Sequence, residues 1–239
     1  MSQRTSAGQK SASIKMEEAK RNQLKQYNED DGHFSLVRNF RLADLITIMN
    51  GVCGLSCIFS CAKYLSAPLE NKSSLWMGLL YPVLGFGFDV FDGKVARWMG
   101  SASMLGQEMD SLADLVSFGV SPALLLFTLG ANSFVDTLLL SFFVSCGLAR
   151  LARFNATCAL IPADTTGKIK YFEGLPIPSS LALVSTMAYW VKKGWYTGQA
   201  GLPLGVWLKD SAFELHPVAL VFLVWGALMV SKTLRIPKL

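Results

Sequence analysis

Long apolar stretches are the feature of this sequence that most limits what the chain can fold into. Six of them follow one another, at 43–64, 75–91, 112–129, 135–151, 175–191 and 215–234. A soluble core needs no apolar run approaching 18 residues, whereas a helix that crosses a bilayer needs about 20. Backbone groups in lipid must be hydrogen-bonded within the protein, and the alternation of a β-barrel is absent, so we expect helices. The sequence predicts an all-α integral membrane protein with six transmembrane helices.

The residues before the first apolar stretch have a different composition. Residues 1–32 are rich in Ser, Lys, Gln, Glu and Asn and lack the apolar core of a signal peptide, which is typical of a disordered tail. Residues 33–41 (HFSLVRNFR) mix aromatic and basic side chains, a pattern that favours an amphipathic helix on the membrane surface. We therefore expect a disordered cytosolic tail over 1–32 and one membrane domain over 33–239.

The distribution of charge predicts the orientation of the membrane domain. Only 16% of the residues are charged, against about 25% in soluble domains, and a chain this apolar is not expected to bind nucleic acid. If the six stretches alternate in direction, 17 of the 22 Lys and Arg residues lie on the side of the N-terminus. Cytosolic loops carry such an excess, so we expect both termini and residues 93–109 and 150–175 in the cytosol.

Four aspartates surround the connection between the second and third apolar stretches. Asp89 and Asp92 are three residues apart and Asp110 and Asp114 four apart, so each pair shares a helix face. The connection returns the chain on the cytosolic side and brings the pairs together. An uncompensated carboxylate deep in a membrane helix costs about 2.5–3.5 kcal/mol, and an all-oxygen site suits Mg²⁺ or Mn²⁺. The pattern predicts a divalent metal site; the alternative is an ion-paired helix boundary exposed to water.

The spacing of these aspartates and their neighbours carries a family resemblance. The motif of the CDP-alcohol phosphatidyltransferases is matched without departure by Asp89, Asp92, Gly93, Ala96, Arg97, Gly106, Asp110 and Asp114. The resemblance implies a six-helix membrane enzyme, usually a homodimer, that cleaves a CDP-linked substrate and transfers its phospho-alcohol part. It implies two divalent ions, Mg²⁺ or Mn²⁺, held on the diphosphate by the four aspartates, with Asp114 as general base. It places the CDP-binding site at Asp92, Gly93, Ala96, Arg97 and Gly106, the last of these in the connecting loop.

The residues around this motif resemble one branch of the family. SLADLVSFGVSPA after Asp110, GLARLARFN at 147–155 and YFEGLPIPSS at 171–180 are similar to phosphatidylserine synthases, and residues 33–51 resemble fungal members. This resemblance implies CDP-diacylglycerol and L-serine as substrates and phosphatidylserine and CMP as products. It also implies the endoplasmic reticulum membrane, with the active site facing the cytosol. A sister transferase that uses inositol or glycerol 3-phosphate stays open, because it shares the eight-residue motif.

Arg150 and Phe154 are the candidates for the serine pocket. They are four residues apart on one helix face at the predicted cytosolic end of the fourth stretch. A guanidinium can bind a carboxylate through two parallel hydrogen bonds, as recognition of an amino acid requires. The alternative for Arg150 is a topology anchor, which is also the interpretation we favour for Arg153. His216 lies apart from the aspartates in the sequence and carries no clear signal.

The aspartates and the cysteines each allow one further interpretation. Intramembrane carboxylates also line the paths of divalent-cation transporters, but such paths run through the depth of the bilayer or between repeated halves. Here the aspartates are confined to one boundary, which favours an enzyme. Cys53, Cys57 and Cys61 share a helix face without a visible fourth metal ligand, so we expect them to be buried packing residues.

Overall fold

The computed structural model describes residues 42–67, 72–98, 104–160, 171–197, 199–209, 213–231 and 235–237. The chain divides into two units, one made of 42–155 and 169–239 and the other of 1–41 and 156–168. Of the second unit, only the end of a helix at 156–160 belongs to the described residues. The predicted tail and the predicted surface helix at 33–41 lie outside them.

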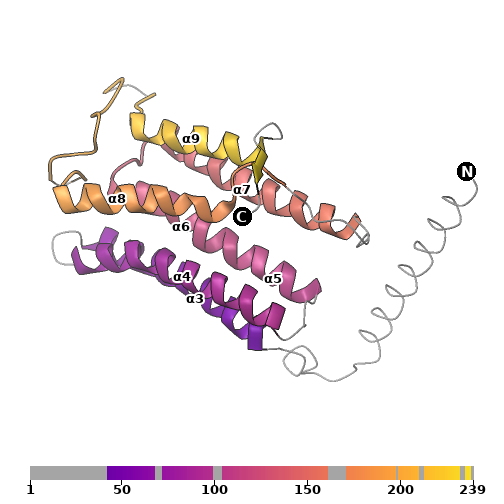
Figure 1. Ribbon diagram of the computed structural model, residues 1–239. Helices are drawn as coiled ribbons and strands as arrows, with labels where there is room; N and C mark the ends of the chain where they lie inside the picture. Colours follow the sequence, from indigo (N-terminus) through magenta and orange to yellow (C-terminus); the bar gives the residue numbers. More distant parts are fainter. Residues whose placement is uncertain are drawn as a thin grey trace, which may run out of the picture. The chain divides into compact units, whose positions relative to one another are not determined.

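The first unit is a bundle of helices (Figure 1). Its helices are α3 (Leu42–Ser66), α4 (Lys72–Trp98), α5 (Met104–Asp114), α6 (Ser121–Leu129), α7 (Phe134–Leu160), α8 (Leu181–Lys193) and α9 (Pro217–Val230). A π-helix, η1 (Leu115–Val120), joins α5 to α6, and a 3₁₀ turn, η2 (Ile177–Ser180), precedes α8. The α5–η1–α6 rod has the most buried surface of the long helical segments, since it lies between α3 and α4 on one side and α7 and α9 on the other.

Four helical segments are long and apolar enough to cross a membrane. They are Ala43–Ser66, Lys72–Val95, Leu105–Leu129 and Phe134–Ala156, which correspond to the first four predicted stretches. The chain is therefore a multi-pass helical membrane protein, as predicted. The last two stretches form shorter α-helices, because Pro176 is extended and η2 precedes α8, and because α9 begins only at Pro217 and ends at Val230.

A short antiparallel pairing forms the two-stranded sheet of the described residues. Strands β1 (Tyr171–Glu173) and β2 (Arg235–Pro237) pair antiparallel, with Phe172 opposite Ile236. Gly174 follows β1 with φ +77°, and a Cβ there would clash with the carbonyl oxygen of Met229. Glycine at this position therefore lets the chain leave β1 directly against the end of α9.

The core of the bundle is apolar and the outer faces of the long helices are apolar too. Phe118, Phe143 and Phe222 are fully or almost fully buried, and the rings of Phe143 and Phe222 meet edge to face with centroids 5.1 Å apart. Cys53, Cys57 and Cys61 are buried and free, as predicted for packing residues. Large apolar side chains on the outer faces of α3 and α4 are exposed, which is the pattern of helices in contact with lipid.

Candidate active site

Three of the predicted metal ligands converge between α4 and α5. The end of α4 carries Asp89 and Asp92, and α5 carries Asp110. One carboxylate oxygen from each of the three lies within 4.8 Å of the others. Asp92 is buried, whereas Asp89 and Asp110 are half-buried and can be reached from outside. The return of the chain after α4 therefore brings the two predicted pairs together, as their helical spacing required.

The chemistry of this group fits a divalent cation. All of its ligand atoms are carboxylate oxygens, which hard cations such as Mg²⁺ and Mn²⁺ prefer. Asp110 Oδ1 is buried and has no hydrogen-bond partner among the described residues. A buried anionic oxygen without a donor is costly, and three like charges at this separation repel one another. A bound dication would remove both penalties.

Asp114, one turn after Asp110, has a different environment from the group of three. It is buried, and its Oδ1 accepts a hydrogen bond of 3.1 Å from Asn50 Nδ2. Asn50 is fully buried on α3, and its own Oδ1 has no hydrogen-bond partner among the described residues. The donor is a neutral amide, so it orients one oxygen of Asp114 without cancelling the negative charge.

A second neutral donor from α3 reaches the group of three. Thr47 Oγ1 lies 2.6 Å from Asp92 Oδ2 and 3.1 Å from the carbonyl oxygen of Ala43, so the shorter contact is the stronger hydrogen bond. Thr47 and Asn50 are three residues apart and share a helix face. Sequence reasoning missed both residues. Their spacing within an otherwise apolar membrane helix is the signal that could have found them.

Two glycines let α3 approach closely enough for these contacts. A Cβ at Gly85 would lie 2.8 Å from Asn50 Oδ1, and one at Gly54 would lie 2.8 Å from Ser117 Oγ. Ser117 Oγ donates to the carbonyl oxygen of Asn50 at 2.9 Å, and Ser121 Oγ lies 3.3 Å from the carbonyl oxygen of Gly54.

The sequence predicted one regular helix over 112–129. The structure instead has π-helix η1 directly after Asp114, a distortion that is common at functional sites.

The predicted CDP-binding residues are only partly described. Gly93 is near the end of α4, and a Cβ there would meet no atom within 4 Å, so this part of the helix leaves open space. The side chains of Ala96 and Arg97 lie outside the described residues. Gly106 is in the first turn of α5, not in a loop as predicted, because α5 already begins at Met104.

The two arginines of α7 lie in different environments. Arg150 is close to the aspartates, whereas Arg153 contacts the end of α9. Arg150 is half-buried in α7, its Nε has no hydrogen-bond partner among the described residues, and its charge is near enough to interact with Asp114. Phe154, one turn later, is exposed. Arg153 Nη1 donates to the carbonyl oxygen of Val230 at 3.1 Å, at the end of α9. This contact fits the structural role predicted for Arg153.

A polar network links the helix that carries Asp110 and Asp114 to the helix that carries Arg150. Asn155 Oδ1 on α7 accepts from Ser111 Oγ at 3.2 Å and from Gln107 Nε2 at 3.4 Å. Asn155 Nδ2 donates to Glu108 Oε2 at 3.0 Å. Sequence reasoning did not find this network. It fixes the position of α5 against α7, and so the distance between the aspartates and Arg150.

Comparison with known proteins gives one family. The model of the CDP-alcohol phosphatidyltransferases matches residues 40–229. CDP-diacylglycerol–serine O-phosphatidyltransferase of Saccharomyces cerevisiae is 48% identical over 217 residues, which are 90% of this chain and 77% of the yeast protein. The Bacillus subtilis protein of the same name is 33% identical over 56% of this chain and 67% of its own length. Archaetidylserine synthase of Methanothermobacter thermautotrophicus is 35% identical over 61% of this chain and 56% of its own length.

Proposed function

The chain belongs to the CDP-alcohol phosphatidyltransferase family, and from this premise we propose that it transfers the phosphatidyl group of CDP-diacylglycerol to L-serine, which forms phosphatidylserine and releases CMP. The observation that carries this proposal is the 48% identity to the yeast serine enzyme over 90% of the chain. The convergence of three carboxylates from α4 and α5 supports the same chemistry.

The metal ligands are Asp89, Asp92 and Asp110, with Asp114 as a further ligand. The unpartnered Asp110 Oδ1 and the all-oxygen composition support two divalent ions, Mg²⁺ or Mn²⁺. Bound there, the ions would neutralise the diphosphate and the charge that develops on the departing CMP. Asp92 also faces the nucleotide, together with Gly93, Ala96, Arg97 and Gly106. The open space at Gly93 supports the approach of a bulky anion.

Asp114 is the general base of the transfer. A serine hydroxyl is a weak nucleophile at neutral pH and needs a positioned proton acceptor. Asn50 occupies Asp114 Oδ1, which leaves Oδ2 to take the hydroxyl proton. The serine oxygen then bonds to the phosphorus that carries diacylglycerol, and the bond from that phosphorus to the CMP oxygen breaks. We infer a single direct displacement, because no separate nucleophile is evident beside the aspartates in the described part of the chain.

Arg150 and Phe154 form the serine pocket. The buried, unpartnered Nε of Arg150 supports this assignment, because a guanidinium near Asp114 would hold the serine carboxylate while the hydroxyl reaches the base. Replacing Arg150 by Lys keeps the charge but removes the planar two-point contact. The variant should need about ten- to a hundredfold more serine for its half-maximal rate, as expected for the loss of about 1.5–3 kcal/mol, with little change for CDP-diacylglycerol. Unchanged serine dependence would return Arg150 to a topology anchor.

In the membrane, α8 and α9 act as the fifth and sixth transmembrane helices. We place both termini and the active site on the cytosolic side of the endoplasmic reticulum membrane, and we propose a homodimer. The excess of Lys and Arg on the side of the N-terminus supports this orientation.

The acceptor alcohol is tested with purified protein and CDP-diacylglycerol. Release of CMP is measured with L-serine, with inositol and with glycerol 3-phosphate as the only alcohol. Serine alone should support turnover, and a chelator of divalent cations should stop it. Faster release with inositol or glycerol 3-phosphate would identify a sister transferase. Uptake of a tracer dication by liposomes that contain the protein but no CDP-lipid would favour a transporter instead.

A further inference from the structure

The connection between α8 and α9 exposes large apolar side chains at the end of the bundle away from the aspartates. Its tip, residues 204–208, includes Leu204, Trp207 and Leu208, which are 75%, 55% and 65% exposed. The same connection buries Tyr196 and Leu202 in the core. Some apolar residues of this connection are therefore buried in the core, while those of the tip are exposed.

The backbone of the tip is held in a conformation that leucine rarely adopts. Leu204 has φ 69° and Leu208 has φ 56°, both in the left-handed region. Such residues persist only when the surrounding structure fixes them. Here Trp207 N donates to the carbonyl oxygen of Leu215 at 2.9 Å, and Leu215 N donates back at 3.1 Å. The Trp207–Leu215 pairing thus holds the backbone of the tip close to the start of α9.

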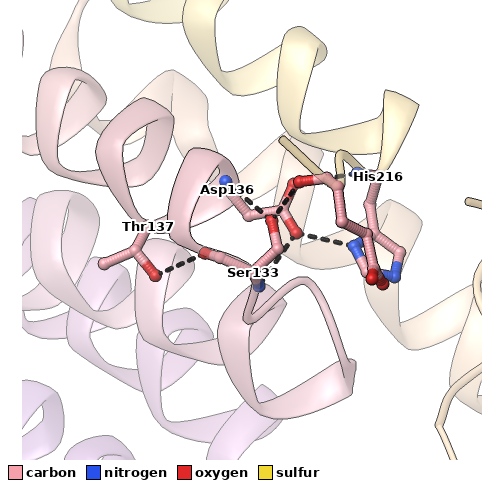
Figure 2. A network of polar contacts seen from close by, with 5 residues as sticks. Ser133, Asp136, Thr137 and His216 are labelled. Carbon is pink, nitrogen blue, oxygen red and sulfur yellow. Dashed lines mark hydrogen bonds and ion pairs between the residues drawn. The ribbon is translucent and has the colours of Figure 1, made fainter. Parts of the chain in front are cut away.

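The base of the connection is fixed to the start of α7 by a buried polar network (Figure 2). Asp136 is fully buried; its Oδ1 accepts from His216 N at 2.9 Å, and its Oδ2 lies 2.6 Å from His216 Nδ1. Ser133 N donates to Asp136 Oδ2, and Asp136 N donates to Ser133 Oγ, which is a capping box. Ser133 Oγ also donates to the carbonyl oxygen of Glu214 at 2.7 Å. The network fixes the end of the connection, and the Trp207–Leu215 pairing joins the tip to that end.

This network also locates the tip at a membrane boundary. The turn between α6 and α7 separates two segments that can each cross a bilayer. Thr197 N donates to the carbonyl oxygen of Leu129 at 2.9 Å, so the connection begins at this turn as well as ending beside it. Along α7, Asp136 and Arg150 are about 21 Å apart at 1.5 Å per residue. The tip therefore lies at the bilayer face opposite to the aspartates.

The neighbouring residues have the composition of a bilayer interface. Lys192 and Lys193 end α8, and Tyr189 and Trp195 pack edge to face with ring centroids 6.1 Å apart. Trp, Tyr and Lys concentrate where the headgroups meet the acyl chains. In addition, the 14 residues of α9 span about 21 Å, less than the hydrocarbon thickness of about 30 Å. A short helix needs flanking residues that make up the difference.

We propose that the tip at 204–208 inserts into the boundary between headgroups and acyl chains of the leaflet opposite to the aspartates. Its partner is the lipid surface itself. The apolar tip supplies the lipid contact that the short helices α8 and α9 lack. The Asp136–His216 network fixes how deep the tip lies relative to the rest of the bundle.

The test uses the full chain with a fluorescent label at the tip. Leu208→Cys carries an environment-sensitive dye, and the matched control is Gln199→Cys, an exposed polar position in the same connection. Cys158 is replaced by Ser in both, and Cys53, Cys57, Cys61 and Cys146 are buried. Both proteins are placed in phosphatidylcholine nanodiscs that hold either one or two chains, with or without lipids brominated near the top of the acyl chains, and iodide is added as the aqueous quencher.

The Leu208 label should emit at shorter wavelength than the Gln199 label and be quenched several-fold more by brominated lipid. The Gln199 label should respond mainly to iodide. Equal quenching of both labels by iodide would overturn the proposal, because the tip would then lie in water. A short-wavelength emission that brominated lipid leaves unchanged, and that is lost when each nanodisc holds one chain, would also overturn it, since the tip would then cover a second copy of the chain.

Discussion

Buried aspartates occur at both ends of the bundle, and they differ in how their oxygens are satisfied. At the α8–α9 end, Asp136 accepts from two backbone N–H groups and from an imidazole, so both of its oxygens have donors. At the other end, Asp110 Oδ1 is buried without a hydrogen-bond partner among the described residues. Asp92 accepts from the Thr47 hydroxyl and from the backbone N–H of Gly93, and Asp114 accepts from the Asn50 amide.

This difference distinguishes a structural carboxylate, Asp136, from carboxylates that still have oxygens free to bind a metal ion. A buried charge with a full set of donors stabilises its surroundings and has no capacity for a further ligand. Carboxylates that converge with few donors repel one another, and a bound dication would relieve that repulsion. A buried carboxylate oxygen without a donor therefore distinguishes the two ends better than burial does, since aspartates at both ends are buried.

The largest expected effect is the loss of activity in Asp92→Asn. The substitution keeps the shape of the side chain but removes a charged ligand from the group of three. We expect CMP release to be abolished, while the melting temperature is unchanged or rises because repulsion among the carboxylates falls. Turnover and thermal unfolding of one preparation check both statements. An active Asp92→Asn protein would end the assignment of this group to metal binding.

The next effect is on stability at the opposite end, in Asp136→Ala. His216 and Ser133 lose their acceptor, and breaking a buried pair typically costs about 3–5 kcal/mol of unfolding free energy. The folded fraction should retain its rate per molecule, because Asp136 is remote from the aspartate group. Thr137→Ala is the matched control: its hydroxyl donates to the carbonyl oxygen of Ser133 on the exposed side (Figure 2), so a change within about 0.5 kcal/mol is expected.

A smaller effect on the rate is expected for Asn50→Leu. Without the amide, Asp114 Oδ1 loses its donor and the base loses its fixed orientation. Loss of a partner that orients a ligand typically costs about 10–100-fold, so kcat should fall by this factor with little change in the serine requirement. Gly85→Ala should act in the same direction, since its Cβ would displace the Asn50 amide. The decrease in kcat of the double variant should then be smaller than the product of the two single decreases. A decrease equal to that product would show that Gly85 does not act through Asn50.

The smallest effect distinguishes Thr47→Val from Thr47→Ser. Valine removes the 2.6 Å hydrogen bond to Asp92 and serine can keep it. We expect Thr47→Val to need about tenfold more Mn²⁺ for half-maximal binding, and Thr47→Ser to behave like the natural chain. Direct titration of Mn²⁺ without substrate measures this separately from turnover. Equal Mn²⁺ affinity in all three proteins would assign Thr47 to helix packing alone.

The sequence predicted well what depends on residues close together in the chain. The first four membrane helices follow from apolar length, and the meeting of Asp89, Asp92 and Asp110 follows from helical spacing and a short return. The contacts Thr47–Asp92, Asn50–Asp114 and His216–Asp136 join residues that are 45, 64 and 80 positions apart. They depend on the rotation and depth of one helix against another.

The rotation of each helix depends on packing against its neighbours, which residue spacing in the sequence does not predict. The clearance of α3 against its neighbours depends on two absent Cβ atoms, at Gly54 and Gly85, and on the wider turn of η1. The predicted stretches 175–191 and 215–234 overestimate α8 and α9, because apolar composition begins before Leu181 and Pro217 and continues after Val230 although the helices do not. Composition fixes which residues prefer lipid, while backbone geometry fixes where a helix stops.

The pairing of β1 with β2 has a consequence for how the molecule comes apart. These two strands close a loop of chain that contains η2, α8, the connection and α9, and Leu175 N adds a bond of 3.3 Å to the carbonyl oxygen of Leu228. The entropic cost of closing a loop grows only with the logarithm of its length, so a few residue pairs can hold a long segment shut. At its other end the same segment is tied to α7 through Asp136. Amide hydrogens of α8 and α9 should therefore exchange with solvent in one shared opening event, so that this third of the chain unfolds as a single cooperative unit.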